Sequence, residues 1–188
     1  PQLLGEFMRR HPAVTLSLHV DNRLIDMVEE GVDLAIRVGR IGDANLIVRK
    51  LQTVPFVVAA SPGYWSARGR PRQPDELASH DALTFSVLGL QPQWQFVIDN
   101  QLLAVPVNSR ADASDAAPLI DLARQGLGMV WMPRLLLAPH LENGSLQAVL
   151  EEFTVRDIWL YAAYAQRRHN SAAMRAMLSL LESHWKQG

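Results

Sequence analysis

One nine-residue stretch, Gly31 to Gly39, constrains the fold of this chain more than any other. Large apolar side chains in it alternate with Asp33, Ala35 and Arg37. An alternation with a period of two is typical of a β-strand with one apolar face. Gly39 then allows a sharp turn out of the strand. Because ligands of open α/β sheets bind beyond the carboxyl ends of the strands, we expect a parallel strand that leads to a ligand-binding cleft.

The residues before this strand predict the remainder of a β-α-β unit. A helix is expected over Pro1 to Arg10, since proline suits a first helical turn. Val14 to Val20 alternates between apolar and polar residues and predicts a half-exposed strand. Asp21 or Asn22 can cap a helix that ends at Glu30. A strand, a helix and a strand in this order predict a right-handed parallel crossover.

The rest of the chain carries further strand and helix patterns. Strands are predicted at residues 46–51, 54–60, 82–86, 94–98, 102–107, 129–132 and 158–165. Asp99 and Asn100 favour a hairpin turn between two of these strands. Helices are predicted from Asp75 to just before His80, from Ser114 or Asp115 to Gly126, from Leu135 to Asn143, and after Asn170.

The domain organisation follows from a change of composition at Pro62, where proline and glycine begin to punctuate the chain. The last strand and helix have no sheet of their own unless the chain returns to the first half. We therefore expect an α/β fold of two Rossmann-like lobes joined by a two-segment hinge. Lobe I is predicted to comprise residues 1–61 with 163–188, and lobe II to comprise residues 62–162.

The composition excludes several functions for this segment. It has 18 basic and 19 acidic residues and a net charge of -1, so it lacks the basic excess of a nucleic-acid-binding surface. The absence of cysteine excludes disulfides and thiolate chemistry. Its apolar runs are shorter than the roughly 20 residues that span a bilayer. Because the chain starts inside a helical pattern, with neither an initiator methionine nor a signal segment, we expect it to be a piece of a longer protein.

Signals for catalysis are weak. The sequence Gly126-Leu127-Gly128 lacks the third glycine of a dinucleotide fingerprint, because Trp131 stands there. The chain contains neither a G-x-S-x-G nucleophile motif nor a Walker loop. Its six histidines are scattered, without the spacing of metal ligands. We therefore predict that the chain is not an enzyme and binds neither a metal nor a cofactor.

Short motifs follow one another in a characteristic order along nearly the whole chain. They are residues 7–14 (F-M-R-R-H-P-x-V), residues 30–39 (E-G-V-D-L-A-I-R-V-G), Ala60-Ser61-Pro62 with Tyr64, Gly69 to Pro74 with Leu77 and His80, Gly126-Leu127-Gly128 with Met132-Pro133, and Gly144 with Leu146. In this order and spacing, the motifs resemble the effector-binding domain of LysR-type transcriptional regulators.

The resemblance implies a two-lobed fold like that of type 2 periplasmic binding proteins. It also implies a small-molecule effector bound between the lobes, and homodimers or homotetramers built on this domain. The DNA contact would belong to an N-terminal helix-turn-helix domain outside this sequence, and the first strand of the domain would lie just before Pro1. A bacterial regulator of this kind is expected in the cytoplasm, without a membrane partner.

Candidate effector-binding residues lie where strands end and helices begin. Free N–H groups after Ser114 and Asp115 would favour an anion, although a plain helix cap facing water explains the same residues. Ser61 could bind a ligand or start a turn, and Thr84 and Phe85 could line a cleft or fill the core. The effector, small and polar with an anion as one candidate, is predicted to contact Gly39, Arg40, Ser61, Thr84, Phe85, Ser114, Asp115, Met132 and Pro133.

Two rival functions share this fold class. A solute-binding protein of a transport system has the same architecture and carries a secretion signal. An enzyme of related α/β architecture is disfavoured because a catalytic constellation is missing. The sequence upstream of Pro1 would separate the three, since it would encode a helix-turn-helix, a signal peptide or neither.

Overall fold

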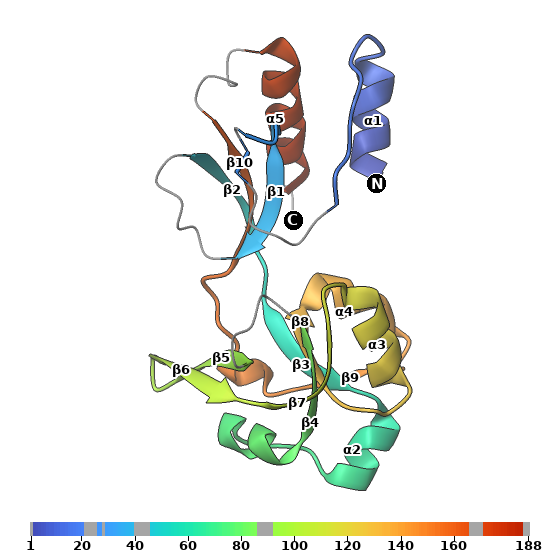
Figure 1. The fold of residues 1–188 in the computed structure, drawn as a ribbon. Coiled ribbons are helices and arrows are strands. Elements are labelled where there is room, and N and C mark those ends of the chain that lie inside the picture. The colour runs from blue at the N-terminus through green and yellow to red at the C-terminus, as the bar shows by residue number, and fades with distance from the viewer. Residues whose placement is uncertain are drawn as a thin grey trace. The chain divides into compact units, whose positions relative to one another are not determined.

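The computed structural model describes residues 2–20, 26–27, 29–39, 46–85, 92–165 and 171–185. The chain divides into two compact units, of which unit 1 comprises Pro1–Thr53 with Asp157–Gly188 and unit 2 comprises Val54–Arg156 (Figure 1). The chain therefore passes between the units twice. The unit boundaries lie after residues 53 and 156, whereas the lobe boundaries were predicted after residues 61 and 162. The first differs because strand β3 (Phe56–Ala60) forms its ladders with β8 (Val130–Pro133) and β9 (Gln147–Val149), all within unit 2.

Unit 1 is a small antiparallel sheet covered by helices. Strand β10 (Trp159–Tyr164) lies between β1 (Ala35–Gly39) and β2 (Ile47–Thr53) and is antiparallel to both. Helix α5 (Ala172–Trp185) packs against β2 and against α1 (Gln2–Arg10). Residues that form this core are Phe7, Leu51, Leu160, Ala162, Met174, Met177, Leu178 and Leu181.

The predicted parallel β-α-β unit is not present among the described residues. Strand β1 pairs there only with β10, in the antiparallel direction, and residues 14–20 form no strand. The predicted helix over 21–30 lies largely outside the described residues. Side-chain alternation predicts an extended segment with one apolar face, but it carries no information about the direction of the neighbouring strand. The partner of Ala35 is Ala163, which is far away in the sequence.

Unit 2 is built around strand β3. Strands β8 and β9 flank β3, both antiparallel to it. Strand β4 (Asp81–Phe85) runs parallel to β7 (Asn108–Ala113), and a parallel bridge from Ala82 to Met129 joins β4 to the start of β8. Both faces of β3 are covered, because Val58 and Ala60 contribute to one buried cluster and Val57 and Ala59 to the other. The unbroken apolar run of β3 is typical of such a doubly covered strand.

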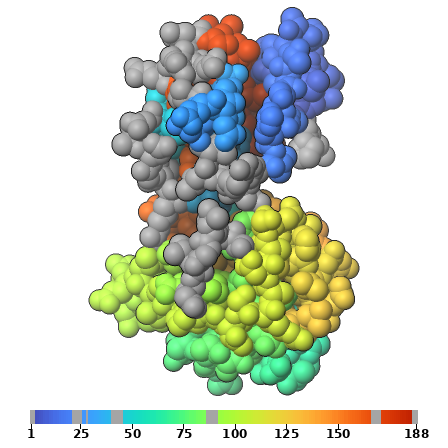
Figure 2. Space-filling view, in the orientation of Figure 1, coloured from blue at the N-terminus to red at the C-terminus, as the bar shows by residue number. Residues whose placement is uncertain are grey.

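Helices and a hairpin complete unit 2. The α-helices are α2 (Pro62–Arg68), α3 (Ala116–Arg124) and α4 (Arg134–Glu142), and the short 3-10 helices are η1 (Pro74–Ser79) and η2 (Glu151–Phe153). Strands β5 (Gln93–Ile98) and β6 (Gln101–Pro106) form the predicted hairpin, which projects at one side of unit 2 in Figure 2. Asp99 and Asn100 have φ values of 48° and 63°, as a type I′ turn requires.

Candidate functional site

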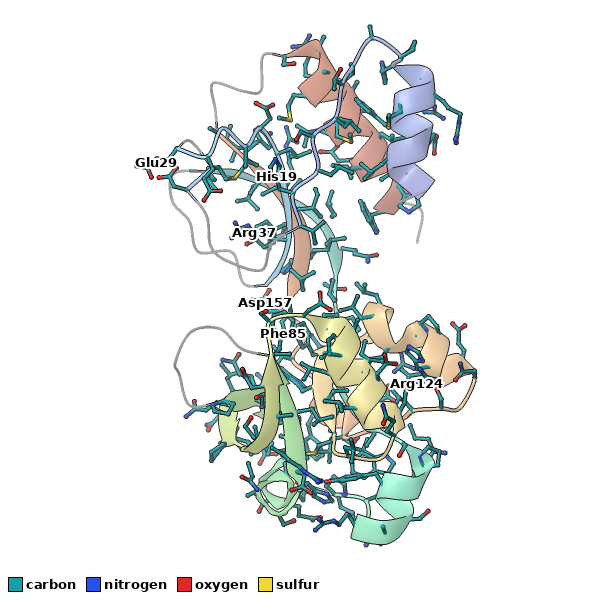
Figure 3. All side chains as sticks on the ribbon, turned by 45° about the vertical axis from the view of Figure 1, so that its right-hand side comes forward. His19, Glu29, Arg37, Phe85, Arg124 and Asp157 are labelled. Atoms are coloured by element: carbon teal, nitrogen blue, oxygen red, sulfur yellow. The ribbon has the colours of Figure 1, made fainter. Side chains whose placement is uncertain are left out.

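The carboxyl ends of three strands in unit 2 lie at one edge of its sheet. Strands β4 and β7 are parallel and in register, so that Phe85 pairs with Ala113. The bridge from Ala82 to Met129 gives β8 the same direction. The edge therefore gathers six of the predicted residues, which are Thr84, Phe85, Ser114, Asp115, Met132 and Pro133. Figure 3 labels Phe85 at the end of β4. This edge is the position expected for a ligand of an α/β sheet.

Thr84 is buried and its hydroxyl is used inside the sheet. Its Oγ1 lies 2.6 Å from Oγ of Ser109 and donates to a carboxylate oxygen of Asp112 at 3.1 Å. Phe85, the next residue along, is exposed at the strand end. Of these two residues, the structure therefore leaves only Phe85 accessible to a ligand, while Thr84 positions Asp112 at the edge.

Asp115 is the N-cap of helix α3. Its Oδ1 accepts a hydrogen bond from the N–H of Ala117 at 2.8 Å, and the carboxylate is exposed. The sequence left Ser114 and Asp115 as alternative caps, and the structure selects Asp115. A carboxylate at this position already supplies the negative charge that a helix N-terminus favours. An anionic ligand would therefore compete with Asp115 here, whereas the exposed Ser114 beside it can offer a hydroxyl.

Met132 and Pro133 differ in accessibility. Met132 is buried in the cluster that also contains Leu83 and Leu119, so it is a core residue. Pro133 is half-buried at the strand end, where Arg134 begins helix α4. The guanidinium of Arg134 forms an ion pair with Glu151. Asp112 was not among the predicted residues, because the mostly polar sequence of residues 108–113 gives no clear strand pattern for β7.

Ser61 lies at the opposite end of the sheet from these residues. Strands β3 and β8 are antiparallel, with Phe56 opposite Pro133 and Ala59 opposite Val130. Ser61 follows β3 and is five residues from Phe56, which corresponds to about 16 Å along a strand. The side chain is buried and accepts a hydrogen bond from the N–H of Tyr64 at 3.2 Å, as the N-cap of α2. The structure thus does not bring Ser61 together with Ser114.

The remaining candidates belong to unit 1. Gly39 is the last residue of β1, two positions after Arg37, which Figure 3 labels. Arg40 lies outside the described residues. The participation of Gly39 and Arg40 in effector binding stays a prediction.

Two further properties concern the described residues only. Within the described ranges, no group of three or more histidine, aspartate or glutamate side chains is arranged to hold a metal ion. Among the helices in this part of the chain, none is both long and apolar enough to cross a lipid bilayer.

Comparison with known proteins identifies the family. The family model described as the LysR substrate binding domain matches residues 1–186. An uncharacterized HTH-type transcriptional regulator from Haemophilus influenzae is 31% identical over 166 residues, which cover 88% of this chain and 58% of that protein. The HTH-type transcriptional regulator CrgA from Neisseria meningitidis is 33% identical over 152 residues, covering 81% of this chain and 50% of CrgA. The chain thus spans little more than half the length of such relatives.

Solved structures agree with this assignment. The regulatory domain of CrgA, a LysR-type transcriptional regulator, is 28% identical, has a TM-score of 0.81, and is matched over 98% of this chain and 90% of that domain. Full-length AphB, a virulence activator of Vibrio cholerae, is 26% identical with a TM-score of 0.82, over 98% of this chain and 62% of AphB. The two-unit α/β architecture is that of these regulatory domains. The chain therefore belongs to the LysR substrate binding domain family, as its motifs indicated.

Proposed function

We propose that this chain is the effector-sensing and oligomerisation domain of a bacterial LysR-type transcriptional regulator, and that it binds a small molecule between its two lobes. The match of the family model over residues 1–186 carries this proposal. The relatives of this chain are HTH-type transcriptional regulators, which supports a regulator over a transport protein or an enzyme. The net charge of -1 supports a DNA contact outside this segment, through an N-terminal helix-turn-helix domain.

The effector site would use the edge formed by the carboxyl ends of β4, β7 and β8. Phe85 supplies an exposed apolar surface there and Ser114 a hydroxyl group. The exposed carboxylates of Asp112 and Asp115 favour an effector that donates hydrogen bonds. An anionic group on the effector would need a cation such as Arg40, which lies outside the described residues. A small polar molecule with donor groups therefore fits this edge better than a simple anion.

A metabolite screen followed by calorimetry tests this site. The chain is screened by thermal shift, and a molecule that stabilises it is then titrated into wild-type protein and Ser114→Ala. A buried ligand group that loses its partner costs roughly 1–3 kcal/mol, which corresponds to an affinity about tenfold to a hundredfold weaker. Ser79→Ala is the matched control, because Ser79 is an exposed serine of unit 2 at the end of η1, which precedes β4 at the strand end opposite to this edge.

The result is interpretable only if stability is measured with affinity. Melting curves of both variants therefore accompany the titrations. An affinity that falls in Ser114→Ala but not in Ser79→Ala supports the proposed edge. Unchanged affinity in Ser114→Ala would place the effector elsewhere on the domain.

A further inference from the structure

A pocket lies at the other end of the unit 2 sheet, remote from the edge proposed for the effector. It is an open cavity of about 630 Å³, a size that accommodates a metabolite. All of its lining residues belong to unit 2. The polar side chains among them include Ser61, Arg68, Asp81, Arg110, Arg124 and Ser145.

Two arginines share one carboxylate in this pocket. Nη2 of Arg68, from the end of α2, donates to Oδ2 of Asp81 at 3.1 Å, and Nη1 of Arg110, from β7, lies 3.5 Å from the same oxygen. Nη1 of Arg110 also donates to the carbonyl oxygen of Leu127 at 3.1 Å. These contacts involve one nitrogen of each guanidinium, and the two side chains remain 54% and 52% exposed. Each guanidinium has five N–H donors, so both can still bind another acceptor.

The charge of the pocket favours an anion. Arg124, at the end of α3 and labelled in Figure 3, is the third arginine in the lining. Its guanidinium lies 3.0 Å from the carboxylate of Asp121, which is on the same helix and is not part of the lining. Asp81 is the one acidic residue among the lining residues. Three guanidinium groups and one carboxylate give the lining a net positive charge.

The backbone holds the wall of the pocket in place. The N–H of Met129 donates to the carbonyl oxygen of Asp81 at 2.9 Å, which ties the turn after α3 to the start of β4. A Cβ atom on Gly126 would lie 3.3 Å from Oγ of Ser61, and φ at Gly126 is +79°. The hydrogen bond holds the start of β4 that carries Asp81, and the close approach of Gly126 to Ser61 leaves little room for a side chain at residue 126. The pocket is therefore set by the packing of unit 2, and Asp81 orients the two arginines before any ligand arrives.

We propose that this pocket binds a small organic anion through Arg68 and Arg110, by its carboxylate or phosphate groups. Guanidinium groups bind both kinds of oxyanion through paired N–H donors. The proposal goes beyond the effector-sensing function and does not rest on it, because the pocket and the effector edge lie at opposite ends of the sheet. The competing explanation is that Arg68, Asp81 and Arg110 form only a structural ion-pair cluster.

Binding of two simple anions to the 188-residue chain tests the proposal. Citrate and inorganic phosphate are titrated separately by calorimetry, at constant ionic strength maintained with chloride. We expect saturable binding of at least one probe, and the preferred probe identifies the carboxylate or phosphate class. Arg68→Gln and Arg110→Gln should each weaken that binding by about tenfold or more, because each removes a charge-assisted bond.

Two further variants make the result specific. Arg134→Gln is the matched control, since it removes the same charge and an ion pair, with Glu151, outside the pocket. Its affinity for the probe should equal that of the wild type. Arg68→Lys retains the positive charge but loses the planar guanidinium fork. It should weaken binding by a smaller factor than Arg68→Gln. It also tests the role of Arg68 in a charge-conserving variant if Arg68→Gln folds poorly. Absence of saturable binding by both probes, or equal weakening in Arg134→Gln, would overturn the proposal.

Discussion

Replacement of Gly128 by alanine should strongly destabilise unit 2. Gly128 is buried between α3 and β8, beside the contact that joins β8 to β4. A Cβ atom on this residue would lie 2.7 Å from the carbonyl oxygen of Asp81 and 3.0 Å from Cγ of Leu83. The first of these atoms belongs to the backbone of β4, so a side-chain rotation does not relieve the contact.

The expected loss of stability is the sum of two costs, the insertion of a methyl group and the displacement of the Asp81 carbonyl. Insertion of a methyl group into a packed core costs about 1–3 kcal/mol. Displacement of the Asp81 carbonyl also weakens the bond that it accepts from the N–H of Met129, at 2.9 Å, and this adds about 1 kcal/mol. We therefore expect Gly128→Ala to lower the free energy of unfolding by about 2–4 kcal/mol.

Urea unfolding followed by tryptophan fluorescence measures this change. Trp65, Trp94 and Trp131 belong to unit 2, whereas Trp159 and Trp185 belong to unit 1, so three of the five tryptophans report on the affected unit. Gly63→Ala is the matched control, because a Cβ atom on Gly63 would meet nothing within 4 Å. Gly63 lies in α2, where alanine is favoured over glycine by up to about 1 kcal/mol. A Gly128→Ala protein as stable as Gly63→Ala would refute the packing argument.

Three other predictions concern pH, DNA and assembly. Burial, and next the charge of Arg68, lower the pKa of His80 below its ordinary value of 6.5. The unfolded chain therefore binds more protons than the folded chain below about pH 6.5, and the free energy of unfolding should fall as pH decreases through that range. Urea titrations from pH 7.5 to 5 check this, and an equally steep fall in His80→Gln would assign it to other groups. The chain alone should not bind duplex DNA in a mobility-shift assay, because it lacks a basic excess, and a specific, salt-sensitive complex would contradict this. Sedimentation should detect dimers or larger assemblies formed through unit 1, whereas a monomer at high concentration would count against that expectation.

Local sequence signals predicted much of the secondary structure. The Asp99-Asn100 turn, the cap of α3 and its end near Gly126 each depend on a few adjacent residues, and the structure confirms them. The order of the short motifs was sufficient to identify the family, which the match over residues 1–186 confirms. Helix α2 carried an equally local signal, because Ser61 is its N-cap and Pro62 opens it. That helix was not predicted, because the same two residues directly follow the strand predicted over 54–60 and also suit a turn.

Only the tertiary structure decided which distant residues meet. The alternation of apolar and polar residues predicted β1 as a strand, but its antiparallel ladder with β10 joins residues 120 or more positions apart along the chain. The register of β3 and β8 placed Ser61 and Pro133 at opposite ends of one sheet. The parallel pairing of β4 with β7 placed Arg110 near Asp81, and the end of α2 brought Arg68 to the same carboxylate, although no motif connects the three. Caps and turns depend on the backbone of neighbouring residues, whereas strand direction and register depend on hydrogen bonds and packing between distant segments.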